Sequence, residues 1–241
     1  MMDVLLVRLK ADLMALPTQI IDKNDAGTQP AGHWPTRSMF VGLVGNCHGV
    51  QDHRPEDRKL LDDLQENLIY AVARLQDGVV TTDYQTADFS LHSRGGKYEA
   101  LWSPYGWIGK DRGAKTYEKR RPYHSGCEFL MAVASPHADL IKSAFRYSKR
   151  IPYLGANACF LTEPLFPRTL QADSLVEALE SQLTKPTPCR WPVQGPERSG
   201  RKIRVVEDKD WTNSVLVGCR LLMEGTLQPS ERHDAAGSLS S

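Results

Sequence analysis

The order of apolar runs and amphipathic segments in the first two-thirds of the chain most limits the folds open to it. Compact apolar runs that contain β-branched residues predict buried strands, and apolar residues spaced three and four apart predict helices that pack on them. The expected strands cover 3–11, 67–75, 78–91 and 127–135, and the expected helices begin at Thr36 or Ser38, at 55 and at 136. Strand, helix, strand is thus followed by strand, helix, strand, which predicts an α+β fold.

This order is that of the ferredoxin-like (RRM-like) βαββαβ domain, which we predict for residues 1–170, with a long insertion, the thumb, at about 85–124. A capped helix at 173–183 and two further strands predict a smaller, β-rich C-terminal part, 171–226, packed on that domain. The polar tail, 227–241, is expected to be flexible.

Composition excludes several classes of protein. The net charge of +1 gives no global basic field, and no apolar run is as long as a membrane span. Five scattered cysteines without a CxxC pair indicate reduced thiols in the cytoplasm and neither a disulfide framework nor a zinc site. Seven histidines form no metal-binding motif, and no nucleophile motif indicates a hydrolase. We therefore expect a cytoplasmic protein with no cofactor, no metal and no membrane partner.

In the segment GHWPTRSMFVGLVGNCHGV, residues 32–50, three residues precede an apolar run that contains three glycines. These residues, His33, Trp34 and Arg37, form an aromatic and basic lip. The glycines match neither a dinucleotide-binding fingerprint nor a P-loop. Their spacing of three and four puts them on one face of a helix, which predicts a smooth stripe where another backbone comes close. They are Gly42, Gly45 and Gly49.

Residues 93–124 have no apolar period, and a loop of this length is usually functional or mobile. Its cations are interleaved with aromatic rings, a combination typical of binding to single-stranded nucleic acid. The cations are Lys110, Arg112, Lys115, Lys119, Arg120 and Arg121. A second cluster, Arg146, Lys149 and Arg150, ends the helix that begins at 136 and could simply complement the negative end of that helix.

The same region offers a catalytic alternative. A metal-independent ribonuclease can use His124 as a general acid or base, with Lys119 and Tyr123 beside it. These residue types are common in any loop that contacts RNA, so binding without cleavage is the stronger interpretation.

Four segments resemble those of a known family, in the same order and with comparable spacing. They are Pro35-Thr36-Arg37-Ser38, Gly42 to Gly49, Asp83-Tyr84-Gln85-Thr86 and Pro152 through Phe166. On these segments the chain resembles the five-series Cas (CasD-like) subunits of the type I-E CRISPR Cascade complex, in the RAMP superfamily. It is a divergent member, since Met39 stands where the family has glycine and Ala156-Asn157 where it has a basic pair.

The resemblance implies a non-catalytic subunit whose thumb and body grip the 5′ handle of the crRNA. Such a subunit caps a filament of Cascade backbone subunits beside the large subunit, and it reaches target DNA only through the complex, in RNA-guided antiviral defence. In the related type I-C systems the five-series protein is instead a metal-independent endoribonuclease that processes the precursor crRNA, and this is the alternative function.

The RNA-binding residues that we expect lie in the lip, the thumb, the end of the helix that begins at 136, and the loop that follows it. We call this loop, Pro152 through Phe166, the PYLG loop. The expected residues are His33, Trp34, Arg37, Ser38, Lys110, Arg112, Lys115, Lys119, Arg120, Arg121, Arg146, Lys149, Arg150, Tyr153, Gly155 and Asn157.

Overall fold

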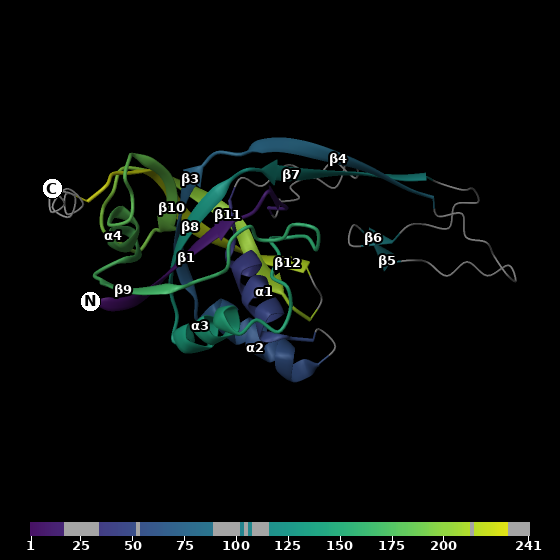
Figure 1. Ribbon diagram of the computed structural model, residues 1–241, viewed down its shortest axis with the longest axis horizontal. Helices are drawn as coiled ribbons and strands as arrows, with labels where there is room; N and C mark the ends of the chain where they lie inside the picture. Colours follow the sequence, from purple (N-terminus) through teal and green to yellow (C-terminus); the bar gives the residue numbers. More distant parts are fainter. Residues whose placement is uncertain are drawn as a thin grey trace, which may run out of the picture.

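The computed structural model describes residues 1–16, 34–51, 54–88, 102–103, 106–107, 116–212 and 215–230. Its centre is a seven-stranded sheet in the order β11-β12-β10-β3-β8-β1-β9 (Figure 1), and every pair of neighbouring strands in it is antiparallel. The strands are β1 (Met2–Lys10), β3 (Ile69–Gln76), β8 (Glu128–Ala134), β9 (Arg168–Ala172), β10 (Thr187–Pro192), β11 (Arg201–Asp210) and β12 (Val215–Leu227). The fold is therefore mixed α/β with a mostly antiparallel sheet.

Helices cover both faces of this sheet (Figure 1). The helices α1 (Arg37–His48), α2 (Pro55–Glu66) and α3 (Ala138–Arg146) pack on one face, and the short α4 (Leu175–Glu180) packs on the other. Side chains of a strand alternate between faces, so Leu5 and Val7 of β1 join the core under α1 to α3, while Val4 and Leu6 join the core under α4. Burial on both faces explains why β1 is a continuous apolar run.

Most of the elements predicted from the sequence are confirmed, but the predicted helix 136–150 ends early. Its last helical residue is Arg146, and the Tyr147 N–H closes the helix on the Ser143 carbonyl. The chain then turns toward α1, where the Lys149 N–H donates to the Cys47 carbonyl at 2.8 Å. Because this contact joins distant segments, the local pattern gave no signal for the helix end.

A long hairpin projects from the body (Figure 1). It consists of β4 (Val79–Asp88) and β7 (Thr116–Ser125), and β2 (Leu13–Met14) joins it in a three-stranded sheet, β2-β7-β4. Two short strands, β5 (Trp102–Ser103) and β6 (Gly106–Trp107), pair with each other. The expectation of irregular structure throughout 93–124 is therefore wrong for 116–124. Polar and charged residues make up most of β7, and Thr81 to Tyr84 on the partner strand are all exposed, so no apolar alternation marks this part of the hairpin.

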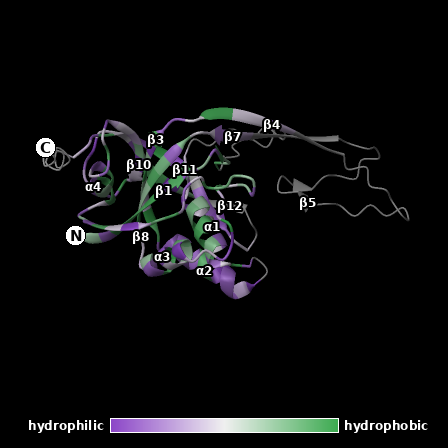
Figure 2. Cartoon of the chain, in the orientation of Figure 1, coloured by the Kyte–Doolittle hydropathy of each residue, from purple (hydrophilic) through white to green (hydrophobic). Residues whose placement is uncertain are grey.

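The glycines of α1 pack closely, but against side chains. A Cβ on Gly45 would lie 2.6 Å from Leu61 Cδ2 of α2, and one on Gly42 would lie 3.4 Å from the Trp211 ring. Gly49 ends the helix in a left-handed conformation with φ 86°. Figure 2 shows hydrophobic residues along α1, which is apolar because α2, α3 and the sheet surround it. The predicted approach of another backbone is thus replaced by the approach of an aliphatic and an aromatic side chain.

The C-terminal strands extend the same sheet beyond β3, through pairing of β10 with β3 and of β12 with β10. They contribute Cys189, Trp191 and Leu227 to the core under α4. The boundaries proposed at 170 and 226 stay a prediction, and residues 231–241 of the predicted tail lie outside the described residues. Within the described part of the chain, no helix has the length and apolar character needed to span a membrane.

Candidate nucleic-acid interface

The lip before α1 lies in the interior of the protein. Thr36 caps α1 by accepting a hydrogen bond from the Met39 N–H at 3.3 Å, so the chain enters the helix as predicted. The exposed fractions are 5% for Trp34, 2% for Arg37 and 7% for Ser38. An RNA contact by these three side chains does not fit their buried positions. His33 lies outside the described residues.

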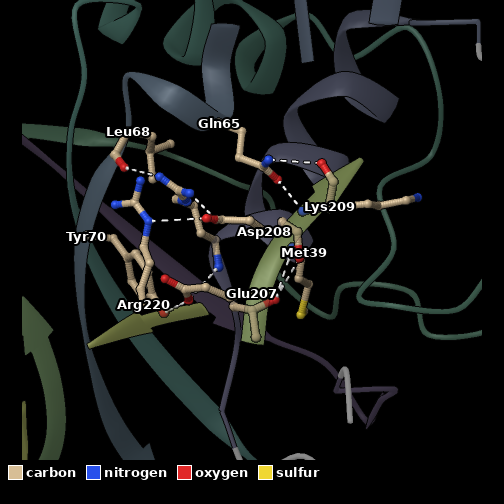
Figure 3. Close-up of polar contacts among 11 residues, drawn as sticks. Met39, Gln65, Leu68, Tyr70, Glu207, Asp208, Lys209 and Arg220 are labelled. Carbon is tan, nitrogen blue, oxygen red and sulfur yellow. Dashed lines mark hydrogen bonds and ion pairs between the residues drawn. The ribbon is translucent and has the colours of Figure 1, made fainter. Parts of the chain in front are cut away.

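Arg37 is held by two carboxylates from β11, of which Glu207 is buried and Asp208 is partly exposed. Its guanidinium forms an ion pair with Asp208 and donates to the Leu68 carbonyl at 3.5 Å, while its backbone N–H donates to Glu207 Oε2 at 3.4 Å. Tyr70 donates to the same Glu207 oxygen at 2.5 Å, and Asp208 also lies 3.6 Å from the Arg220 guanidinium (Figure 3). A carboxylate at the first turn of α1 is also favoured by the helix dipole. Arg37 therefore joins α1 to the C-terminal strands.

An irregular strand makes this arrangement possible. Successive side chains of a regular strand point to opposite faces. The pairing of β11 with β12 shifts register around Asp208, so both Glu207 and Asp208 reach the N-terminus of α1. Gln65 of α2 supports the shift, because its side-chain amide makes two 3.0 Å hydrogen bonds with the backbone of Lys209 (Figure 3). Two adjacent acidic residues in a predicted strand are the signal that could have indicated this site.

Burial raises the pKa of the Glu207 carboxyl, and the hydrogen bond from Tyr70 and the nearby Arg37 only partly oppose that rise. The Tyr70 hydroxyl is also buried, and burial together with the Glu207 charge raises its pKa well above its usual value. A carboxyl with a raised pKa holds its proton more tightly in the folded protein than in the unfolded chain. Its contribution to stability is thus fully present below the unfolded pKa and is lost as the pH rises through the folded pKa.

The contribution of Glu207 to stability thus falls as the pH rises, which gives a prediction for Glu207→Gln, because the glutamine amide stays neutral at every pH. As the pH rises from about 4 to about 7, we expect the stability of the variant to increase relative to wild type. Urea unfolding at a series of pH values measures the difference, with Glu197→Gln on the exposed surface as the control. A fall in the stability of the variant relative to wild type over this pH range would show that Glu207 is stabilised as a carboxylate.

The Trp34 ring is covered by guanidinium groups. Those of Arg74 and Arg190 lie 5.0 Å and 4.9 Å from the ring centroid, and Phe129 packs beside it at 6.0 Å. Such cation–π contacts gain strength where water is excluded. Trp34 thus links β3, β8 and β10 in the interior and has no exposed face to offer a base.

The predicted cluster after α3 is exposed. Arg146, Lys149 and Arg150 all lie on the surface, and Tyr147 and Ile151 between and beside them are 67% and 71% exposed. Backbone contacts hold this segment to the end of α1: the Lys149 N–H donates to Cys47, and the Asn46 side chain donates to the Ile151 carbonyl at 2.9 Å. The cations therefore sit on a fixed segment that joins two helices.

The PYLG loop follows directly and is folded on itself. The Leu154 N–H donates to the Cys159 carbonyl, the Cys159 N–H donates to the Ala156 carbonyl, both at 2.8 Å, and Tyr153 pairs with Phe160 in an isolated bridge. Tyr153 is half-buried, Asn157 is exposed and Phe160 is 54% exposed. The loop thus presents an exposed amide and an exposed aromatic ring in the part of the chain that follows the cations of 146–150.

The hairpin carries the thumb residues that fall within described backbone. Arg121 lies opposite Asp83 in the ladder, Arg120 opposite Tyr84, and Lys119 opposite Gln85. Positions 110, 112 and 115, expected to contact phosphates, lie outside the described residues. His124, the catalytic alternative, is 6% exposed at the base of β7, and Tyr123 is half-buried.

The sheet, the projecting hairpin and the exposed basic segment together define a protein with the α/β fold of CRISPR-associated proteins. A solved chain of a "CRISPR RNA-guided surveillance complex" matches it with a TM-score of 0.61 and 20% identity, covering 94% of this chain and 91% of that one. A "Crystal structure of Cas protein" matches with a TM-score of 0.61 and 19% identity, covering 94% and 95%. At these identities the likeness shows the fold alone.

The chain belongs to the Cas5 family of CRISPR-associated proteins. Residues 4–218 match the family described as "CRISPR-associated protein (Cas_Cas5)", Cas_Cas5d. A curated relative, "CRISPR system Cascade subunit CasD" of Escherichia coli (strain K12), is 32% identical over 161 residues, which cover 64% of this chain and 66% of that protein. The match therefore spans just under two thirds of that relative's length. The resemblance predicted from the sequence is confirmed at the level of the family.

Proposed function

We propose that this protein is a non-catalytic, RNA-binding subunit of a type I Cascade-like complex in the cytoplasm. It binds the 5′ handle of the crRNA and caps the backbone filament, with the backbone subunit and the large subunit as its protein partners. Target DNA is reached only through the assembled complex. Membership of the Cas5 family and the identity to a Cascade subunit support this proposal.

The observation that carries the proposal is the exposed basic segment between α3 and the PYLG loop. Arg146, Lys149 and Arg150 supply three exposed cations within five residues. Single-stranded RNA is bound by cations that neutralise phosphates and by rings on which unpaired bases stack. Tyr147 is an exposed ring within this segment, and Phe160 is an exposed ring in the PYLG loop that follows it in the chain.

The RNA-contacting residues of this proposal are a subset of those expected from the sequence. They are Arg146, Lys149, Arg150, Tyr153 and Asn157 on the body, and Lys119, Arg120 and Arg121 on the hairpin. The buried Trp34, Arg37 and Ser38 are left out, and Gly155 acts through the backbone of its loop.

We also assign residues 2–172 to the ferredoxin-like topology. Four strands occur in the sheet in the order β3-β8-β1-β9, which in chain order is second, third, first and fourth. Helices α1 and α2 connect the first to the second, and α3 connects the third to the fourth, on one face of the sheet. This is the arrangement of a βαββαβ unit.

The endoribonuclease alternative is less well supported. A general acid or base must come within hydrogen-bonding reach of the group that it protonates or deprotonates. His124 is buried at the base of the hairpin, where its backbone pairs with Met14 and Val80. A phosphodiester on the surface is therefore out of reach of this side chain in the observed conformation.

Neutralising the basic segment tests the proposal. In an R146Q/K149Q/R150Q variant we expect weaker binding of a single-stranded RNA that has the sequence of the crRNA 5′ handle. Each lost phosphate contact removes about 0.7 from the slope of log K against log salt for a single strand, so the slope should fall by about 2. Fluorescence anisotropy over a salt series measures both the affinity and the slope.

The matched control is K185Q/K202Q/R204Q, which removes the same charge from exposed positions on other elements. Its affinity and salt slope should stay close to those of wild type. Equal slopes for the two triple variants would mean that 146–150 does not contact RNA. Metal-independent cleavage of the RNA by the full chain, lost in His124→Ala, would favour the nuclease alternative instead.

A further inference from the structure

The short strand β2 lies against the base of the hairpin along one of its edges. Leu13 pairs with Ser125 and Met14 with His124, and the Gly126 N–H donates to the Asp12 carbonyl at 3.1 Å. Met14 is fully buried in the core, and the Cys127 thiol contacts its sulfur atom at 3.4 Å. The strand is thus fixed both to the hairpin and to the body.

The PYLG loop lies against the backbone of the residues on either side of β2. The Ala15 N–H donates to the Leu154 carbonyl at 3.0 Å. Ala11 pairs with Leu161 in an isolated bridge, and the Thr162 N–H donates to the Lys10 carbonyl at 3.0 Å. Backbone hydrogen bonds therefore run without interruption from the loop, through residues 10–15, to the hairpin.

Gly155 makes this contact possible. It has φ 82°, in the left-handed region that glycine tolerates best, and a Cβ at this position would lie 1.7 Å from the Ala15 carbonyl oxygen. No side chain can relieve such an overlap, because the atom that it meets is backbone. Any other residue must move the loop away from β2.

We propose that β2 is a positioning strand and Gly155 a positioning residue, which hold the PYLG loop and the hairpin at a fixed separation so that both contact one RNA strand. This inference rests on the proposed function, since it assumes that RNA is the ligand of both segments. Two contacts on one rigid frame act as a bivalent site, in which binding to one segment raises the effective concentration of RNA at the other. If the loop moves, each segment binds alone.

The test compares Gly155→Ala with Gly195→Ala, in the full chain. A Cβ on Gly195 would lie 3.7 Å from its nearest neighbour, an ordinary contact, so this variant controls for the glycine-to-alanine change itself. We expect Gly155→Ala to bind the same 5′-end RNA at least about 10-fold more weakly and Gly195→Ala to bind as wild type does.

A second measurement separates positioning from loss of structure. The hairpin is weakened by K119Q/R120Q/R121Q and the loop by Y153A/N157A, singly and together, in the presence and absence of Gly155→Ala. Where Gly155 is kept, one RNA strand contacts both segments, so each single change should weaken binding strongly. In the Gly155→Ala background each segment binds alone and can replace the other, so each single change should have a small effect and only the combined change should remove binding. Should Gly155→Ala fail to fold, Ala15→Pro removes the N–H that joins residue 15 to the loop, in exchange for a fixed φ at that position.

The outcomes distinguish this inference from the proposed function. If neither the hairpin nor the loop variant weakens RNA binding, both fail. If each of the two changes weakens binding by the same factor in both backgrounds, the RNA function stands and the positioning role of β2 is wrong.

Discussion

Replacing Arg37 with methionine is expected to lower the free energy of unfolding by about 3–5 kcal/mol, because it removes the buried guanidinium that forms an ion pair with Asp208 and lies near the buried Glu207. Glu207 is fully buried, and Asp208 is only 22% exposed. Methionine keeps most of the side-chain volume, so the loss reports on charge more than on packing. Urea unfolding followed by circular dichroism measures it.

The control for Arg37→Met is Arg146→Met, which removes a cation from the surface and should change the stability by less than about 0.5 kcal/mol. A double variant with Asp208→Asn should lose less than the sum of the two single changes, since both remove the same ion pair. An Arg37→Met protein with wild-type stability but weakened RNA binding would contradict the buried role and return this residue to the interface.

Trp34→Ala is expected to cost about 3–5 kcal/mol of stability, as large-to-small changes of buried aromatic residues do. The ring is 5% exposed and packs against Phe129, and both Arg74 and Arg190 stack on it. The change leaves a cavity and removes the cation–π contacts of two partly buried guanidinium groups. Thermal and urea unfolding measure the effect.

Phe160→Ala should have the opposite effects to Trp34→Ala on stability and on RNA affinity. Phe160 is 54% exposed in the PYLG loop, so its loss should leave stability nearly unchanged. If a base stacks on this ring, RNA affinity should fall by an amount worth about 1–3 kcal/mol. The reverse pattern, with Trp34→Ala affecting RNA binding alone, would mean that the lip faces the RNA.

The elements of the fold could be predicted where local signals decide them. Thr36 begins α1 because its side chain caps the helix, and the apolar run 127–135 forms β8 because the core takes up both of its faces. The end of α3 and the extent of β7 could not be predicted. They depend on contacts with α1 and with β4, which lie far away in the sequence.

The candidate site was predicted in part. The basic segment at 146–150 stood out by its charge, and the structure exposes it. The lip was predicted to contact RNA because Arg37 beside an aromatic residue resembles a surface site, whereas the structure buries Trp34 and Arg37. Its carboxylate partners lie 170 and 171 positions further along, in a strand whose register shift no local pattern reveals.

β10 comes late in the chain but lies inside the sheet, and this has a consequence for synthesis of the protein. β10 lies between β3 and β12, so β3 lacks a neighbour on one side until residues 187–192 have left the ribosome. Arg37 meets its acidic partners later still, once β11 has emerged. Long-range pairing of this kind forms slowly, and an unfinished chain exposes apolar surface. The nascent N-terminal two-thirds should therefore depend on chaperones until the last strands close the sheet.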